Sequence, residues 1–244
     1  MPPITSFSVD AAFNGPPTSA NGGYACGVLA ELAMSAGHLT GPLAVSLHLP
    51  VPLDTPLAYR PAGRRGHAWH GEDVVATVTA ANGAVAAPAA VSATTAAAAQ
   101  ESFSGAGHPF PTCFVCGTER EKDGLSLRPG AVEGRPDTVA CGWRPRPELA
   151  DASGLVRPEV VWAALDCPGG WTTDPVRRPR LLGRMTAGID ELPRAGADYV
   201  VVGRLDGVQD RTATNVTALY EAGTGRLLAR ASALWIAIDA GPAA

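Results

Sequence analysis

The spacing of apolar residues predicts two amphipathic helices, one in each half of the chain. The first spans about residues 21–37, and its large apolar residues fall on one helix face: Tyr24, Val28, Leu29 and Leu32. Its small residues predict close packing against a sheet: Ala25, Gly27 and Ala30. The second helix spans about residues 158–168, with Pro158 in its first turn. Pro168-Gly169-Gly170 is expected to end it.

Extended segments follow each helix. In the first half they lie at about 43–50, 67–80 and 84–95, and in the second half at about 181–191, 198–207, 211–221 and 226–238. The closest internal match pairs residues 78–93 with 217–236. Asn82-Gly83 and the turn at 222–225 predict a hairpin in each. Pro88, within one segment, is compatible only with an edge strand or a bulge. The order of elements favours two copies of one α+β unit over a single sheet.

The stretch between the two copies has the composition of a connector. Residues 94–130 mix alanine, glycine, proline and charged residues and then enter the first strand of the second copy. The alanine run at 96–99 is also compatible with a short helix. We therefore expect an N-terminal unit at 1–100, a connector at 101–124 and a C-terminal unit at 125–244.

Composition excludes several classes of protein. Of 244 residues, 46% are hydrophobic and 17% charged, which supports a sizeable core. A net charge of −4 gives no basic field for nucleic acid or membranes. No signal peptide and no membrane-spanning run is recognisable. The cysteine count is odd: Cys26, Cys113, Cys116, Cys141 and Cys167. An odd count without a signal peptide predicts reduced thiols and a cytoplasmic location.

Two short features carry candidate chemistry. Asn21-Gly22-Gly23 opens the first helix, where glycine costs stability unless a close approach of the backbone requires it. Asp166 is an acid among apolar neighbours on the second helix. Backbone N–H groups at a helix start can stabilise an oxyanion, and a partly buried carboxylate has a raised pKa suited to a base. The alternatives are structural. The glycines would form a tight turn, Asn21 would cap the helix, and Asp166 would bond to backbone groups.

These features resemble the hotdog fold, and their duplication resembles a double-hotdog protein of the acyl-CoA thioesterase type. In many hotdog thioesterases a His-Gly-Gly turn opens the central helix, and a carboxylate lies nine residues after the histidine. Here Asn21 replaces the histidine, and the nearest acid, Glu31, is one position out of phase. In the second copy the turn is Arg157-Pro158-Glu159, yet Asp166 falls at the nine-residue offset. The resemblance implies one retained site, with the glycine turn of one unit facing Asp166 of the other.

The same resemblance implies a thioesterase acting on acyl-CoA or an acyl carrier protein. The glycine turn would be the oxyanion hole and Asp166 the base or nucleophile, with Glu31 the acid of a second site or a solvated residue. Candidate substrate-binding residues are Tyr24, Trp162, Trp171, Arg177, Arg178 and Arg180. A solvated loop is the alternative for the arginines. No cofactor is expected, and pairing into a homodimer is compatible with open hotdog sheets. The rival functions are a hotdog dehydratase or another acyl-thioester enzyme, and a non-catalytic acyl-ligand-binding protein.

Cys113 and Cys116 form a Cys-x-x-Cys pair. A structural zinc ion needs four ligands, commonly from a second such pair, which the sequence lacks. The remaining candidates, His108, Cys141 and Cys167, are scattered along the chain. We therefore expect a thiol pair without a metal. The absence of Walker A, Gly-x-Gly-x-x-Gly and Gly-x-Ser-x-Gly motifs argues against nucleotide binding and serine-hydrolase chemistry.

Overall fold

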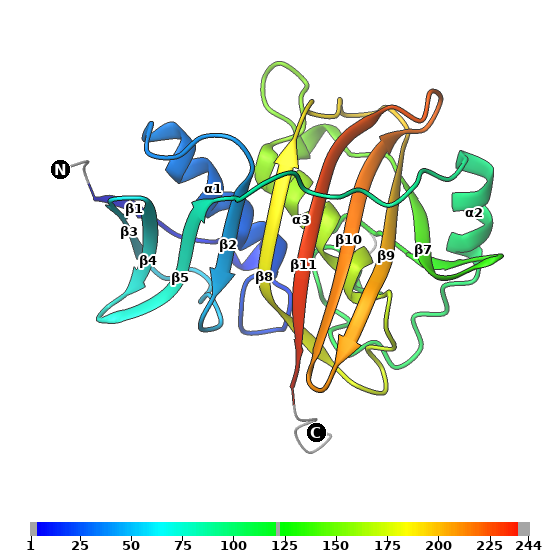
Figure 1. The fold of residues 1–244 in the computed structure, drawn as a ribbon, viewed down its shortest axis with the longest axis horizontal. Coiled ribbons are helices and arrows are strands. Elements are labelled where there is room, and N and C mark those ends of the chain that lie inside the picture. The colour runs from blue at the N-terminus through cyan, green and yellow to red at the C-terminus, as the bar shows by residue number, and fades with distance from the viewer. Residues whose placement is uncertain (1–3, 121–122, 239–244) are drawn as a thin grey trace.

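The computed structural model describes residues 4–120 and 123–238 (Figure 1). Its α-helices are α1 (Gly22–Ser35), α2 (Ala93–Glu101) and α3 (Pro158–Gly170). Two short 3-10 helices are η1 (Ala11–Phe13) and η2 (Pro147–Leu149). The strands are β1 (Thr5–Phe7), β2 (Leu43–Leu47), β3 (Leu57–Ala62), β4 (Arg65–His70), β5 (Asp73–Ala80), β6 (Gly130–Val132), β7 (Arg135–Trp143), β8 (Arg180–Ile189), β9 (Tyr199–Gln209), β10 (Thr212–Glu221) and β11 (Leu227–Ala237). In the described ranges no helix is long and apolar enough to cross a membrane.

All the strands belong to one antiparallel sheet built from two similar halves. The strand order is β1-β3-β4-β5-β2-β8-β11-β10-β9-β7-β6. Each half therefore repeats one arrangement in mirrored order around the central β2–β8 pair, which runs from Leu43↔Ala187 to Ser46↔Arg184. Each half also has its own long helix, α1 or α3, on one face of the sheet (Figure 1). The expected pair of α+β units is confirmed. The accompanying expectation against a single sheet is wrong, because the β2–β8 pairing joins both halves into one continuous sheet.

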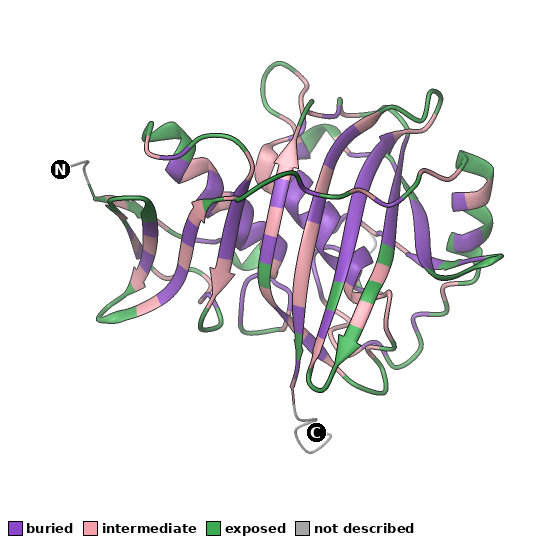
Figure 2. Cartoon of the chain, in the orientation of Figure 1, coloured by how far each residue is buried: buried purple, intermediate pink, exposed green. Residues whose placement is uncertain are grey.

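The helices α1 and α3 pack against each other as well as against the sheet. A Cβ atom on Gly27 would lie 2.5 Å from Cα of Glu159 and 2.9 Å from Cβ of Trp162, both on α3. The small residue at 27 therefore permits a helix–helix contact, and not the helix–sheet contact expected from the sequence. Buried residues concentrate along α3 and the strands in front of it (Figure 2). The main core is thus continuous between the two units.

The helix α2 covers the other face of the second half. Its buried residues, Ala96 and Ala99, cluster with Ala140, Val200 and Val202 of β7 and β9. Val201, which points to the opposite face, belongs instead to the core around α3. Strand β9 is therefore buried on both sides at its start, which explains its continuous run of valines.

The expectation of a strand at 84–95, with a hairpin at Asn82-Gly83, is wrong. Residues 81–92 have no regular structure, and α2 begins at Ala93, capped by Ser92, whose Oγ accepts from the Thr95 N–H at 3.0 Å. Pro88 has no N–H for a strand ladder, and its carbonyl oxygen instead accepts a hydrogen bond from the Tyr220 hydroxyl. In the mirrored strand order, the hairpin that corresponds to β10–β11 is β4–β5. It lies one element earlier than the hairpin that was expected at Asn82-Gly83.

The second helix ends about two residues later than expected. Pro168-Gly169-Gly170 forms the last turn of α3, which ends at Gly170. Side chains of β10 satisfy carbonyl groups of this last turn. Thr217 Oγ1 donates to the Leu165 carbonyl oxygen at 2.8 Å, and Asn215 Nδ2 donates to that of Gly169 at 2.9 Å. The neighbouring strand thus stabilises a turn that propensity alone would break.

Candidate functional site

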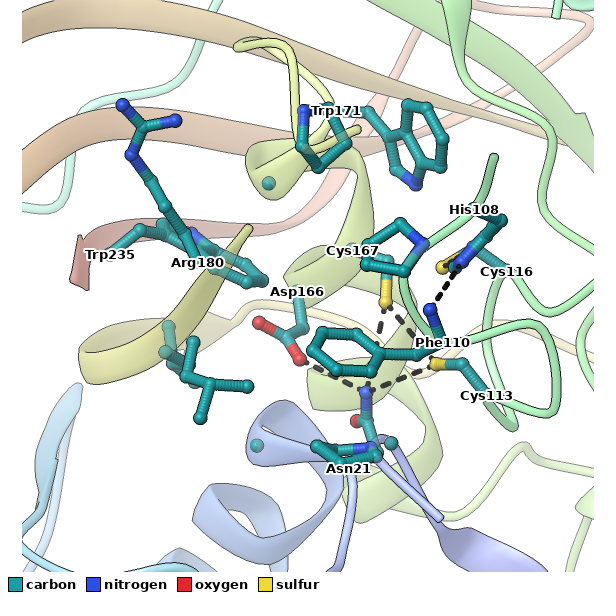
Figure 3. Close-up of a pocket in the computed structure, with 18 residues that line it drawn as sticks. Asn21, His108, Phe110, Cys113, Cys116, Asp166, Cys167, Trp171, Arg180 and Trp235 are labelled. Carbon is teal, nitrogen blue, oxygen red and sulfur yellow. Dashed lines mark hydrogen bonds between the residues drawn. The ribbon is translucent and has the colours of Figure 1, made fainter. Parts of the chain in front are cut away.

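Asp166 of α3 meets the first turn of α1 in the buried region between the two units. Its Oδ2 accepts hydrogen bonds from the Gly23 backbone N–H at 2.9 Å and from Asn21 Nδ2 at 3.1 Å. The carboxylate belongs to the second unit and both donors belong to the first, as Figure 3 shows for Asp166 and Asn21. The structure therefore brings together the acid and the glycine turn that the sequence analysis paired.

Asn21 connects the start of α1 to this carboxylate. Its Oδ1 accepts the Tyr24 N–H at 2.9 Å, which is the N-cap bond expected from the sequence. The same bond orients the side-chain amide, so that Nδ2 faces Asp166. One residue thus caps the helix and holds the acid.

The two glycines are required by protein contacts. A Cβ atom on Gly23 would lie 2.4 Å from Cβ of Asp166 and 2.7 Å from the Trp162 carbonyl oxygen. On Gly22 it would lie 2.8 Å from Cβ of Leu182. The N–H of Gly23 donates to Asp166, whereas no hydrogen bond is formed by the N–H of Gly22 among the described residues. As the first residue of α1, Gly22 has an N–H that the helix itself does not satisfy.

Burial raises the pKa of Asp166 to about 7, while the hydrogen bonds from Gly23 and Asn21 act in the opposite direction. The other carboxylate oxygen, Oδ1, is buried and has no hydrogen-bond partner among the described residues. Asp166 therefore has one anchored oxygen and one oxygen free to accept a proton. This is the geometry of a positioned general base.

A pocket opens beside Asp166, with a cavity volume of about 60 Å³. That volume suits a few water molecules and not a long acyl chain. Lining residues from both units include Asn21, Gly22, Asp166, Trp171, Arg180 and Trp235. Figure 3 shows Asp166, Trp171 and Arg180 around this space.

Arg180 is the arginine of the predicted set that lines the pocket. Its Nη1 donates to Thr173 Oγ1 at 3.0 Å and to the Arg178 carbonyl oxygen at 3.3 Å. Arg177 and Arg178 lie in the exposed loop that precedes β8. The three arginines therefore divide between the pocket wall and the adjoining surface.

Three further candidates lie away from this pocket. Tyr24 is in the core, stacked on Phe13 with ring centroids 4.0 Å apart. Trp162 and Glu31 line a second pocket. Glu31 is half-buried, and burial followed by the charge of Glu159 raises its pKa. Of the three aromatic candidates, Trp171 is the one that lines the same pocket as Asp166.

A group of thiols at this pocket was not expected from the sequence. Cys113 and Cys116 of the connector lie beside Cys167, the residue after Asp166, and all three line the pocket. Asn21 Nδ2 lies 3.9 Å from Cys113 Sγ and 3.7 Å from Cys167 Sγ (Figure 3). The position of Cys167 next to the candidate acid was the one signal for this grouping, because the connector and α3 are far apart in sequence.

No protein-family model and no curated protein matches the sequence. Solved structures do match over nearly the whole chain. A tesB protein of Mycobacterium avium subspecies paratuberculosis has 12% identity and a TM-score of 0.65, with 97% of this chain and 93% of that chain covered. A hotdog-fold protein of unknown function from Alicyclobacillus acidocaldarius has 15% identity and a TM-score of 0.60, with 98% and 94% covered. The acyl-CoA thioesterase II TesB2 of Mycobacterium marinum has 12% identity and a TM-score of 0.58, with 96% and 93% covered.

The chain has the double-hotdog fold. Two tandem units with mirrored strand order, each with a central helix, account for the full-length matches. At these identities the likeness shows the fold alone.

Proposed function

We propose that this double-hotdog protein hydrolyses acyl thioesters, with Asp166 as the general base. The observation that carries the proposal is the carboxylate of one unit held by the glycine turn of the other at the edge of a pocket. The full-length structural matches to proteins named tesB and acyl-CoA thioesterase II support the same reaction class.

The proposed reaction begins with a water molecule next to Asp166 Oδ1. Asp166 Oδ1 takes a proton from the water molecule while the oxygen of that water attacks the thioester carbonyl carbon. Negative charge develops on the carbonyl oxygen, and the Gly22 N–H at the start of α1 would stabilise it. The carbon–sulfur bond then breaks, and the proton on Asp166 passes to the departing thiolate. The anchored oxygen Oδ2 keeps the carboxylate in place throughout.

We propose acyl-CoA as the substrate, with an acyl carrier protein as the alternative carrier. Trp171 and Trp235 offer apolar surface to the acyl end of the pocket. Arg177 and Arg178 lie on the adjoining loop and could pair with the phosphate groups of coenzyme A. Because the pocket is small, a short acyl group fits this conformation best.

The test is thiol release from a panel of acyl-CoAs of increasing chain length, with the wild type and Asp166→Asn. Asparagine preserves the size of the side chain and an oxygen for the Gly23 N–H, but it cannot act as a base. The expected loss of kcat is about 10²–10⁴-fold with an unchanged far-ultraviolet circular dichroism spectrum. Wild-type protein that releases no thiol from any acyl-CoA or acyl carrier protein would reject hydrolysis and favour a binding role.

An isotope experiment separates the base from the nucleophile. In a single turnover in ¹⁸O-water, a general base delivers the label to the released acid only. A nucleophilic Asp166 forms an anhydride whose hydrolysis can leave label in the Asp166 carboxylate. Label in the peptide that contains residue 166 would therefore replace the proposed role of Asp166 and keep the reaction.

A further inference from the structure

We propose that Cys113, Cys116 and Cys167 bind one zinc ion, in a site that joins the connector to α3 beside Asp166. The three Sγ atoms lie within 4.8 Å of one another, and those of Cys113 and Cys167 are 3.8 Å apart. Two thiolates on a tetrahedral zinc ion, each at about 2.3 Å from the metal, are separated by about 3.8 Å. The separation of Cys113 and Cys167 is therefore that of two ligands on one zinc ion, and Cys116 lies close enough to supply the third with a small adjustment.

The chemistry of the donors favours zinc over the hard cations. Thiolates are soft ligands that select zinc and related metals over magnesium or calcium. All three cysteines are buried, and none forms a disulfide. Binding would release the thiol protons to solvent and leave three thiolates around the ion. No oxidant is needed, unlike for a disulfide between Cys113 and Cys167.

The Cys-x-x-Cys turn is built to present both sulfurs on one side. Phe114 and Val115, between the two cysteines, are fully buried. The Phe114 N–H donates to the Asn14 carbonyl oxygen, and the carbonyl oxygens of Phe114 and Val115 accept from the N–H groups of Leu125 and Leu127. A Cβ atom on Gly117 would lie 2.5 Å from the Cys113 and Pro111 carbonyl oxygens, so the turn needs glycine there. Arg128 fixes the far side, donating to the Cys116 carbonyl oxygen at 2.9 Å and to that of Gly117 at 3.2 Å.

His108 supports the site from the second layer. Its Nε2 lies 3.2 Å from Cys116 Sγ, and its Nδ1 accepts the Phe110 N–H at 2.9 Å. A neutral imidazole that accepts at Nδ1 carries its proton at Nε2, and so donates it to the sulfur. His108 then stabilises a coordinated thiolate without binding the metal. The fourth position is left to a water molecule, since the three cysteines line the pocket.

The consequence of such a site is a fixed position for α3 at the proposed base. Cys167 follows Asp166 directly, and Asn21 Nδ2, which holds Asp166, lies within 4 Å of Cys113 Sγ and Cys167 Sγ. The zinc ion would tie the connector to α3 and define where the Asn21 amide can lie. This role does not depend on which reaction the pocket performs.

The first experiment measures metal in the untagged full chain, purified under reducing conditions and equilibrated with zinc before desalting. We expect about one zinc ion per chain by elemental mass spectrometry and by native mass spectrometry. Cys113→Ala, Cys116→Ala and Cys167→Ala should abolish binding, whereas Cys26→Ala and Cys141→Ala, at buried cysteines outside the cluster, should retain it. His108→Ala should weaken affinity about 10–100-fold and keep the stoichiometry.

Wild-type protein without stoichiometric zinc would overturn the proposal, as would equal zinc loss in the Cys26 or Cys141 variants. If the cluster variants fail to fold, cobalt-loaded wild type decides the question. Thiolate-to-cobalt charge-transfer absorption with tetrahedral ligand-field bands is expected, and a spectrum of octahedral cobalt without that absorption would overturn the site. These readouts do not use activity, so they stand or fall separately from thioester hydrolysis.

Discussion

The starts of α1 and α3 occupy corresponding places in the two units, but they differ in the hydrogen-bond donors that they offer to a carboxylate. At α1, Asn21 and the N–H of Gly23 both donate to Asp166 of the other unit. At α3, the corresponding turn is Arg157-Pro158-Glu159, in which Pro158 has no N–H and Arg157 makes no side-chain cap.

The two units also differ in whether an acid lies at the position opposite the helix start of the other unit. Asp166 lies opposite the α1 turn, whereas the position corresponding to it on α1 is Ala30, and Glu31 is one residue further on. Glu31 lies near another acid, Glu159, and its buried Oε1 has no partner among the described residues. One inter-unit site thus has complementary donors and acceptor. In the other, Glu31 lies near a second carboxylate, Glu159, which is itself in an ion pair with Arg157. A fused pair of units can keep a single site because each unit needs to supply only half of it.

The largest contrast is expected in catalysis. Asp166→Asn should lower kcat by about 10²–10⁴-fold, and Glu31→Gln should leave it within a factor of about three, because only the first site has a positioned acid. Steady-state thiol release with both variants provides the measurement. Equal losses in the two would contradict the single-site interpretation, and a loss confined to Glu31→Gln would move the proposed base to the second pocket.

The next contrast is in stability and its pH dependence. Unfolded Asp166 ionises near its ordinary pKa of 3.8, and the folded residue at about 7, so the folded state binds more protons between these values. The contribution of the protonated Asp166 carboxyl to the free energy of unfolding is therefore at its full value below pH 3.8. It is lost as the pH rises through 7, and the loss is at most about 4 kcal/mol. Asp166→Asn removes this loss.

Urea unfolding of wild type and Asp166→Asn at several pH values from 5 to 8.5 tests this expectation. The free energy of unfolding of the variant, relative to wild type, should increase across this range and level off above pH 7. The comparison between the two proteins cancels most other titrating groups. A difference that does not change with pH would show that Asp166 ionises in the folded state at an ordinary pKa.

A smaller effect is expected from packing at the α1 turn. Gly23→Ala introduces a methyl group 2.4 Å from Cβ of Asp166 and should lower the free energy of unfolding by about 1–3 kcal/mol. Residue 159, at the corresponding position of α3, already has space for a Cβ atom. Glu159→Ala should therefore change the free energy of unfolding much less. Gly223→Ala is the control, since Gly223 has open space around it. Thermal unfolding of the three variants is the measurement, and a tolerated Gly23→Ala would mean that the helices separate easily.

The sequence was informative where a local pattern determines the structure. Helical spacing located α1 and α3, and the short polar side chain of Asn21 correctly predicted a cap. The prediction of a strand at 84–95 was wrong because an apolar, alanine-rich run suits a strand, a helix or an irregular stretch. Packing on β7 and β9 decided among these structures. The thiol cluster could not be found from spacing, because Cys167 joins Cys113 and Cys116 only after the connector folds back onto α3. Likewise, the purpose of Gly23 depends on Asp166, a residue of the other unit.

The smallest contrast concerns the two N-cap residues. Asn21→Ala removes the acceptor of the Tyr24 N–H and should cost about 1 kcal/mol in the free energy of unfolding, whereas Arg157→Ala removes no cap and should change it by less than about 0.5 kcal/mol.

Asn21→Ser separates the two roles of Asn21. Serine caps a helix well, so it should restore most of the stability, but its side chain is too short to hold Asp166. Chemical unfolding and thiol release measured on the same samples should therefore show a stable Asn21→Ser protein with impaired turnover. Full activity in that variant would mean that the Gly23 N–H alone positions the carboxylate.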